Sequence, residues 1–376
     1  MKKYNYKYFW IFTIVISCIL FCAFIFKIKI KQKFIKIGLC VQLSGPGAEL
    51  GLGVRNGARL AVDKINANGG IAGKKIILLV KDDQGKPTIA KQKDLELIKQ
   101  GVVAIIGHIT SSVSIAAVPI ANKYKTVLLS PTSSTPALKD KDDYFFRIDK
   151  VSEDEAQLLA NFAFNHLKLN QIGIIWDKKN IYYSRYYARN FTQAFSKLGG
   201  NVLFSIGYDK PNSINLSLEK ITPQFKIKNI LFICSDIDLL AFLKSKFRHI
   251  SYILASGWPM TQTLTINKPL LENKNIFFAS STPPKKNQKE IIFEESYKKI
   301  YGFSPVFSAA RGYDAVRLIV KALQINPNNL KKGLLKIKNF PGIQYKITFN
   351  KYGDIKTPTY IYQIKNGHFI HIKYDK

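Results

Sequence analysis

Two stretches of sequence decide the fold: VVAIIGHITSS at residues 102–112 and TVLLSPTSST at residues 126–135. In each, a short apolar run stops abruptly in small hydroxyl side chains. An alternating apolar segment, residues 114–124, lies between them and predicts a helix that joins two buried strands. Free N–H groups at a helix start and hydroxyl donors favour a bound anion. The sequence therefore predicts a site that captures a small acid rather than one that performs covalent chemistry.

The same alternation of strand and helix continues on both sides of these stretches. Residues 34–42 and 75–80 are predicted strands, and residues 54–68 and 88–99 are predicted helices. A second, similar series begins after residue 147 and ends in predicted β-hairpins. This alternation is typical of α/β proteins with doubly wound, mostly parallel sheets. Ligands of such sheets bind outside the carboxyl ends of the strands, where the hydroxyl loops are expected.

Length and charge limit the classes of function. A chain of 376 residues is long enough for two domains. Its net charge of +32 comes from lysines spread along the whole chain, without an arginine-rich block or a nucleic-acid-binding signature. We therefore expect no nucleic-acid partner. The spread of the lysines fits a solvated cationic surface that is attracted to anionic lipid better than it fits a nucleic-acid-binding site. A polyanion-binding surface protein remains an alternative.

The N-terminal segment, residues 1–34, is predicted as a membrane signal-anchor. Residues 8–26 form an uncharged apolar run with lysines on both sides, and a membrane-spanning helix needs about 20 such residues. No small-x-small cleavage site precedes Lys27. A cleaved signal peptide, or a lipoprotein signal that ends at Cys18, is the alternative.

No motif indicates a metal site, a cofactor or an enzyme. Cys40 and Cys234 lie in apolar runs, where we expect inert buried thiols, and the chain has no Cys-x-x-Cys pair. We expect His108 to hydrogen-bond within its own loop and Asp83 to lie at a solvated strand end. Neither a Gly-x-Ser-x-Gly motif nor a nucleophile–base pair is visible. We therefore predict a binding protein that has no cofactor.

A group of motifs resembles a known family over residues 35–376. They are SGP at 44–46, GARLAVDKINANGGIAG at 57–73, DD at 82–83, IGHITSS at 106–112, SPTSSTP at 130–136 and GYDA at 312–315, with Tyr183 further along. Together they resemble the branched-chain amino-acid-binding proteins, which are type I periplasmic solute-binding proteins of ABC transporters. Each motif alone is weak, and the combination is specific.

This resemblance implies two Rossmann-like lobes joined by three crossovers, near residues 149–152, 280–282 and 340–342. Lobe 1 would comprise residues 35–150 and 281–341, and lobe 2 residues 151–280 and 342–376. The implied function is that of a membrane-tethered, extracytoplasmic protein that captures a small amino acid or carboxylic acid. It would deliver this ligand to ABC permease subunits. The alternative is a ligand-sensing module of the same fold without transport.

The resemblance also implies a carboxylate half of the site in lobe 1. Ser111, with Ser112 beside it, corresponds to the serine whose hydroxyl and N–H hold the ligand carboxylate. Ser134 lies where a threonine does the same, and Thr132 where a backbone carbonyl meets the ligand's ammonium. From the residues alone, these serines could equally be helix caps, because serine is a preferred N-cap.

The remaining implied contacts include two departures from the family. Tyr183 corresponds to an aromatic residue that covers the ligand from lobe 2, and Leu50 lies in the lip of lobe 1 where a tyrosine is common. The loop at residues 256–259 carries Trp258 but no carboxylate to pair with an ammonium. Asp236 is the predicted substitute. Otherwise the ligand is an acid or amide without an amino group.

Overall fold

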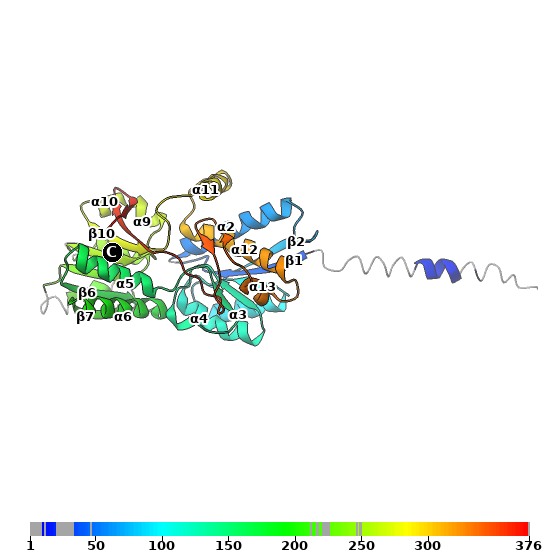
Figure 1. Cartoon of the computed structure of the whole chain (residues 1–376), viewed down its shortest axis with the longest axis horizontal. Coiled ribbons are helices and arrows are strands. Elements are labelled where there is room, and N and C mark those ends of the chain that lie inside the picture. The colour runs from blue at the N-terminus through cyan, green and yellow to red at the C-terminus, as the bar shows by residue number, and fades with distance from the viewer. Residues whose placement is uncertain are drawn as a thin grey trace, which may run out of the picture.

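The computed structural model describes residues 10, 13–19, 34–45, 47–210, 213–215, 218–219, 226–245, 247 and 250–374. They form two lobes that lie side by side (Figure 1). Most of the predicted signal-anchor, residues 8–26, lies outside the described residues. Within the described ranges, no helix combines the length and the apolar character needed to cross a membrane.

The first lobe is built on a five-stranded parallel sheet in the order β2-β1-β3-β4-β5. Its strands are β1 (Phe34–Val41), β2 (Lys75–Asp82), β3 (Ala104–Ile106), β4 (Val127–Ser130) and β5 (Phe145–Arg147). Its main helices are α2 (Ala48–Ala67), α3 (Pro87–Lys99), α4 (Ser111–Lys123), α11 (Gln288–Tyr301), α12 (Phe307–Ile325) and α13 (Leu330–Leu335).

Both faces of this sheet are buried, because side chains alternate along a strand. Leu39 and Ile106 pack in the cluster that includes α2 and α12. Cys40 and Ile105, one residue away in each strand, pack in the cluster that includes α3 and α4. The near-continuous apolar runs of the strands are therefore explained by burial on two sides.

The second lobe has a seven-stranded sheet in the order β14-β13-β10-β9-β8-β6-β7. Its strands are β6 (Gln171–Asp177), β7 (Asn201–Tyr208), β8 (Asn229–Ile233), β9 (Tyr252–Ser256), β10 (Asn275–Ser280), β13 (Tyr360–Lys365) and β14 (His368–Ile372). The strands from β7 to β10 run parallel, and the hairpin β13–β14 adds antiparallel strands at one edge. The turn of that hairpin is Asn366-Gly367, with positive φ at both residues.

Helices cover both faces of the second sheet as well. α5 (Glu153–Asn161) and α6 (Ile181–Lys197) pack on one face. α8 (Asp236–Leu243), α9 (Gln262–Ile266) and α10 (Lys268–Leu271) pack on the other. The predicted α/β class, with two doubly wound lobes, is confirmed.

The chain passes from one lobe to the other after β5, after β10 and before β13. The last passage lies later than the sequence predicted. Ile347, Phe349 and Ile355 belong to the core of the first lobe, and the Phe349 ring meets Phe146 edge-on at 5.4 Å. Residues 342–355 therefore lie with lobe 1 and not with lobe 2. Their short hairpin, β11 (Phe340–Pro341) with β12 (Lys346–Ile347), pairs apart from both large sheets.

Candidate functional site

A small cavity of about 50 Å³ lies between the lobes. Residues after β4, β5 and β10, and those just before α4 and α6, line it. This location is the carboxyl edge of both sheets, as the strand–loop–helix pattern predicted. Of the predicted site residues, the following line the cavity: Leu50, Ser111, Thr132, Ser134, Tyr183 and Trp258.

Hydroxyl side chains from two loops form the wall of lobe 1. Ser111 is the first residue of α4, and its helix cap, Thr110, makes no side-chain capping bond. The Ser133 hydroxyl donates to Ser111 Oγ at 3.3 Å, and Thr132 Oγ1 donates to the Ile109 carbonyl at 2.7 Å. With Ser134 beside them, these groups place hydroxyls and the positive end of a helix dipole at one end of the cavity.

Ser112 does not line the cavity, although the sequence predicted that it would. Successive helix residues point about 100° apart, so Ser112 faces lobe 2 instead. Its N–H donates to Asn180 Oδ1 at 3.1 Å, and its hydroxyl accepts from the N–H of Tyr182 at 3.4 Å. Ser112 therefore joins the start of α4 to the start of α6 across the cleft.

Aromatic and aliphatic side chains cover the other side. The rings of Tyr183 and Trp258 meet edge-on, with 5.8 Å between their centroids. Leu50 and Phe307 approach from lobe 1. Burial raises the pKa of the Tyr183 hydroxyl well above its ordinary value, so this phenol stays neutral. The cavity thus has a polar end and an apolar cover.

An ion pair that the sequence analysis did not identify forms part of the cavity lining. Arg311 on α12 contacts Asp149 with 2.5 Å between Nη1 and Oδ2, and its Nη2 donates to Ser281 Oγ at 2.9 Å. Its Nε is buried without a partner among the described residues. The only sequence signal for this site is a charged residue in the apolar stripe of a helix, which is easily taken as an exposed position.

Glu155 is a second acidic group at the cavity that sequence reasoning missed. It lies in the first turn of α5, only 8% exposed, and lines the cavity. Burial, and next the charge of Asp149, raise the pKa of Glu155 to about 8. Its sequence context, Glu153-Asp154-Glu155, is ordinary for a helix start, where acidic residues favour the dipole.

Asp236 does not line the cavity. Its carboxylate accepts a hydrogen bond from the Thr261 hydroxyl at 2.6 Å and one from the N–H of Ile237 at 2.9 Å. Asp236 therefore joins the start of α8 to the start of α9. This placement disagrees with the expectation that its carboxylate faces the ligand's ammonium. Gly257, from the loop without a carboxylate, does line the cavity.

The sequence model of the periplasmic binding protein family matches residues 35–368. The chain belongs to the periplasmic binding protein family. It is 31% identical over 145 residues to the Leu/Ile/Val-binding protein BraC3 of Rhizobium johnstonii, an alignment that covers 38% of this chain and 40% of that protein. The chain spans about half or less of the length of the curated relatives it matches.

Solved structures share the fold of this family member over nearly its whole length. The substrate-binding protein LivJ of Streptococcus pneumoniae, in complex with isoleucine, has a TM-score of 0.80 and 24% identity, with 91% of this chain and 100% of that chain covered. A solute-binding protein from R. palustris in complex with benzoate has a TM-score of 0.79 and 18% identity, with 90% and 95% covered. The fold thus occurs with an amino acid in one neighbour and an aromatic acid in another.

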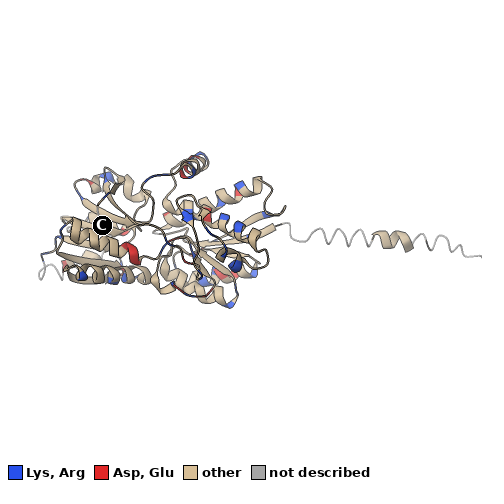
Figure 2. Ribbon diagram, viewed as in Figure 1, with Lys and Arg blue, Asp and Glu red and all other residues tan. Residues whose placement is uncertain are grey.

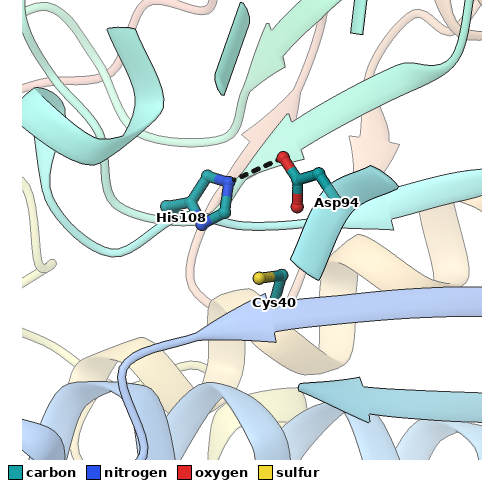
Figure 3. Close-up of side chains that lie close together, drawn as sticks. All are labelled: Cys40, Asp94 and His108. Atoms are coloured by element: carbon teal, nitrogen blue, oxygen red, sulfur yellow. Dashed lines mark hydrogen bonds and ion pairs between the residues drawn. The ribbon is translucent and has the colours of Figure 1, made fainter. Parts of the chain in front are cut away.

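In this periplasmic binding protein, a buried cluster of polar side chains lies around His108, which precedes Ser111 in the chain (Figure 3). His108 Nδ1 lies 2.7 Å from Asp83 Oδ2, and Nε2 lies 3.1 Å from Asp94 Oδ2. Cys40 is close enough for the three residues Cys40, Asp94 and His108 to surround an ion. The expectations that His108 bonds within its own loop and that Asp83 is solvated were wrong, since both are buried and the partners come from other segments.

Charge explains this cluster without a ligand. Burial by itself lowers the pKa of His108, but the charge of Asp94 and the other polar neighbours raise it well above the ordinary value. The imidazolium therefore lies between two carboxylates, with both nitrogens in use. Burial also raises the pKa of Cys40 to about 12, so it stays a thiol. The cluster fixes the loop that leads to Ser111.

Proposed function

We propose that this protein is an extracytoplasmic solute-binding protein that captures a small amino acid or carboxylic acid between its lobes and delivers it to ABC permease subunits. One observation carries the proposal. The cavity has hydroxyl donors and the start of α4 at one end, with an aromatic cover at the other. A carboxylate at the polar end would accept hydrogen bonds from these donors and gain from the helix dipole.

The names of the relatives support a role for this protein in amino-acid transport. Curated relatives include a protein named as Leu/Ile/Val-binding and one named as leucine-specific-binding. A sensing role without transport stays the second candidate, because ligand capture is common to both roles. Uptake of labelled ligand by cells that lack the protein separates the two, since only a delivery protein is required for uptake.

The location of the protein follows from the same family. Periplasmic binding proteins act outside the cytoplasm, and residues 8–26 provide the apolar run that export requires. We propose that this run stays attached as a signal-anchor. A cleaved signal remains the alternative. Lys and Arg are distributed over both lobes (Figure 2), which suits a body facing an anionic membrane surface.

The site is tested by removing its two donor hydroxyls. The double variant Ser111→Ala with Ser134→Ala should bind the ligand at least about 100-fold more weakly, because each hydrogen bond to a charged group is worth about 1.5–3 kcal/mol. The ligand is first identified by thermal shift against amino acids, 2-oxo acids, aromatic acids and amides. Affinity is then measured by calorimetry.

Ser205→Ala, at an exposed position of β7 in lobe 2, is the matched control and should bind normally. Unchanged affinity in the double variant, with a normal melting temperature, would remove Ser111 and Ser134 from the site. Loss of the folded state would show instead that they support the structure.

A further inference from the structure

The acidic groups around the cavity differ in how they are neutralised. Asp149 is paired with Arg311 and also accepts a hydrogen bond from Ser281 at 3.1 Å. Glu155 has no such partner, since no hydrogen bond or ion pair to its carboxylate occurs among the residues that the structure describes. One buried carboxyl at the cavity therefore lacks a counter-charge.

The charged groups that face Glu155 do not supply this counter-charge. They are Asp149, Asp154, Lys150 and Arg311, with the phenols of Tyr183 and Tyr187 close by. The Lys150 ammonium points to the Thr357 carbonyl at 3.3 Å and to Thr359, and lies 3.6 Å from Asp154. Arg311 is committed to Asp149 and Ser281. Both neighbouring cations are therefore already used.

Besides its aromatic cover, the cavity lining contains two kinds of polar group with opposite chemical preferences. The wall of Ser111, Thr132 and Ser134 offers donors, which suit an anion. Glu155, on the far side of the first crossover, offers an acceptor that lacks a cation. An α-amino acid presents an anion and a cation about one small group apart, and buried charges are stable only when paired.

We propose that Glu155 is the counter-charge for the ammonium group of the ligand, so that the site selects a small zwitterionic amino acid over the same acid without its amino group. The inference rests on the proposed solute-binding function and names the ligand class of that site. It assigns to α5 the role for which the sequence analysis nominated Asp236.

Binding would then be linked to loss of a proton. Without a cation beside it, Glu155 is protonated below a pH of about 8, because burial raises its pKa to that value. Contact with the ligand's ammonium requires the carboxylate, so each binding event below pH 8 transfers the Glu155 proton to the buffer. The affinity should rise about tenfold per pH unit between pH 6 and 7 and level off near pH 8.

A ligand without an amino group would give the opposite result. A neutral Glu155 would donate its O–H to an oxygen of such a ligand and would keep its proton. Binding would release no proton, and affinity would fall as the pH rises through 8, where the carboxyl ionises. The two classes of ligand are therefore distinguished by whether the affinity rises or falls with increasing pH.

Calorimetry on the full chain tests the inference. The L-amino acids are titrated one at a time, followed by the 2-oxo and des-amino analogues of the tightest binder, in phosphate and in Tris at pH 7. Different binding heats in the two buffers give the number of protons released. We expect close to one proton for the amino acid, and at least about 100-fold weaker binding of the des-amino acid.

Two variants complete the test. Glu155→Gln should lose the proton release and bind the amino acid about 100-fold more weakly, since it removes one partner of a buried charge pair. Glu153→Gln, in the same helix turn but ion-paired with Lys139 at 3.1 Å outside the cavity, should behave as the unmodified protein. The melting temperature of each variant shows whether it is folded, so that weaker binding is not confused with misfolding.

The melting temperature of Glu155→Gln independently checks that the pKa of Glu155 is raised, because a raised pKa predicts the direction in which the stability changes. The folded protein favours protonated Glu155, whose pKa rises from 4.5 to about 8, so this group's stabilising effect is lost as the pH rises through that range. The Gln variant should therefore gain stability relative to the unmodified protein between pH 5 and 8.

Each result has one meaning. Equal affinity for the amino acid and its des-amino analogue, or unchanged proton release in Glu155→Gln, overturns the role of Glu155 and leaves the solute-binding function intact. Absence of binding by every amino acid, 2-oxo acid and aromatic acid overturns the proposed function, and this inference with it.

Discussion

At the scale of single residues, the folded state depends on charges placed where water cannot reach. Arg147 at the end of β5 is fully buried, and its guanidinium holds Asp354 at 2.6 Å and the Thr135 carbonyl at 2.7 Å. Asp354 lies far along the chain, just before the last passage between lobes. One side chain thus ties three distant segments of lobe 1 together.

Replacing this arginine should be far more damaging than replacing an exposed lysine. Arg147→Met should lower the free energy of unfolding by about 3–5 kcal/mol, because it leaves Asp354 buried without its cation. Lys178→Met, which breaks the exposed pair with Asp209, should cost less than about 1 kcal/mol. Urea denaturation of both variants measures the difference, and similar losses would contradict the importance given to burial.

Residue roles at the site were only partly predictable from the sequence. Ser111 and Ser134 follow buried strands, and a strand end is a position that periodicity can locate. The structure places Ser112 and Asp236 away from the cavity lining, because the direction of a side chain depends on helix rotation and on partners such as Thr261. Glu155 was missed because its acidic neighbours, half-buried Glu153 and exposed Asp154, make it look like part of a solvated turn.

At the scale of elements, α2 and α12 pack closely enough that their backbones nearly touch. A Cβ at Gly57 would lie 1.9 Å from the Ala309 carbonyl oxygen, and one at Gly312 would lie 2.2 Å from that of Val54. Gly53 and Gly57 therefore serve the packing of α2 against α12 and the residues that lead into it. α2 accordingly begins at Ala48, earlier than the predicted residue 54.

Gly57→Ala should destabilise the protein despite its better helix propensity. The substitution would normally gain roughly 0.5–1 kcal/mol inside a helix, whereas forcing α12 away should cost about 1–3 kcal/mol net. Gly53→Ala in the same helix meets mainly the side chains of Val306 and Ser308, which can shift, so its cost should be smaller. Thermal unfolding compares the two. A stabilised Gly57→Ala would show that the helices can separate freely.

Helices and strands could be predicted from the sequence more completely than the residues of the site. Apolar runs bounded by glycine and hydroxyl residues located the strands, and the predicted C-terminal hairpins include β13–β14, whose turn is Asn366-Gly367. The third crossover was misplaced because β11 and β12 pair only with each other. The sequence of such an isolated hairpin does not indicate which lobe its apolar residues pack against.

At the scale of the whole molecule, two sets of contacts hold the lobes together around the cavity. On one side, Glu49 of α2 accepts hydrogen bonds from the backbone N–H of Gln262 at 2.8 Å and of Thr263 at 3.2 Å, at the start of α9. On the other, Ser112 meets Asn180 between α4 and α6. Each of these contacts joins a residue of lobe 1 to a residue of lobe 2.

Glu49→Ala should therefore weaken ligand binding without touching the cavity. A smaller closed population reduces the apparent affinity in proportion, and we expect a loss of up to about tenfold from removing this group of hydrogen bonds. Glu96→Ala is the control, because the partners of the Glu96 carboxylate, Lys81, Lys93 and Gln92, all lie in lobe 1. Calorimetry gives the affinity and X-ray scattering the degree of closure. Equal affinities in both variants would show that Glu49 does not stabilise closure.

The passages between the lobes also set the order in which a nascent chain can complete its structure. β1 ends at Val41 and α12 begins at Phe307, so the ribosome makes almost all of lobe 2 before the helix that covers one face of the first sheet. The strands of lobe 2 from β6 to β10 leave the exit tunnel as one uninterrupted segment. Lobe 1, although synthesised first, therefore presents an apolar surface to chaperones or the export machinery until α12 emerges, and the hairpin β13–β14 of lobe 2 is made last of all.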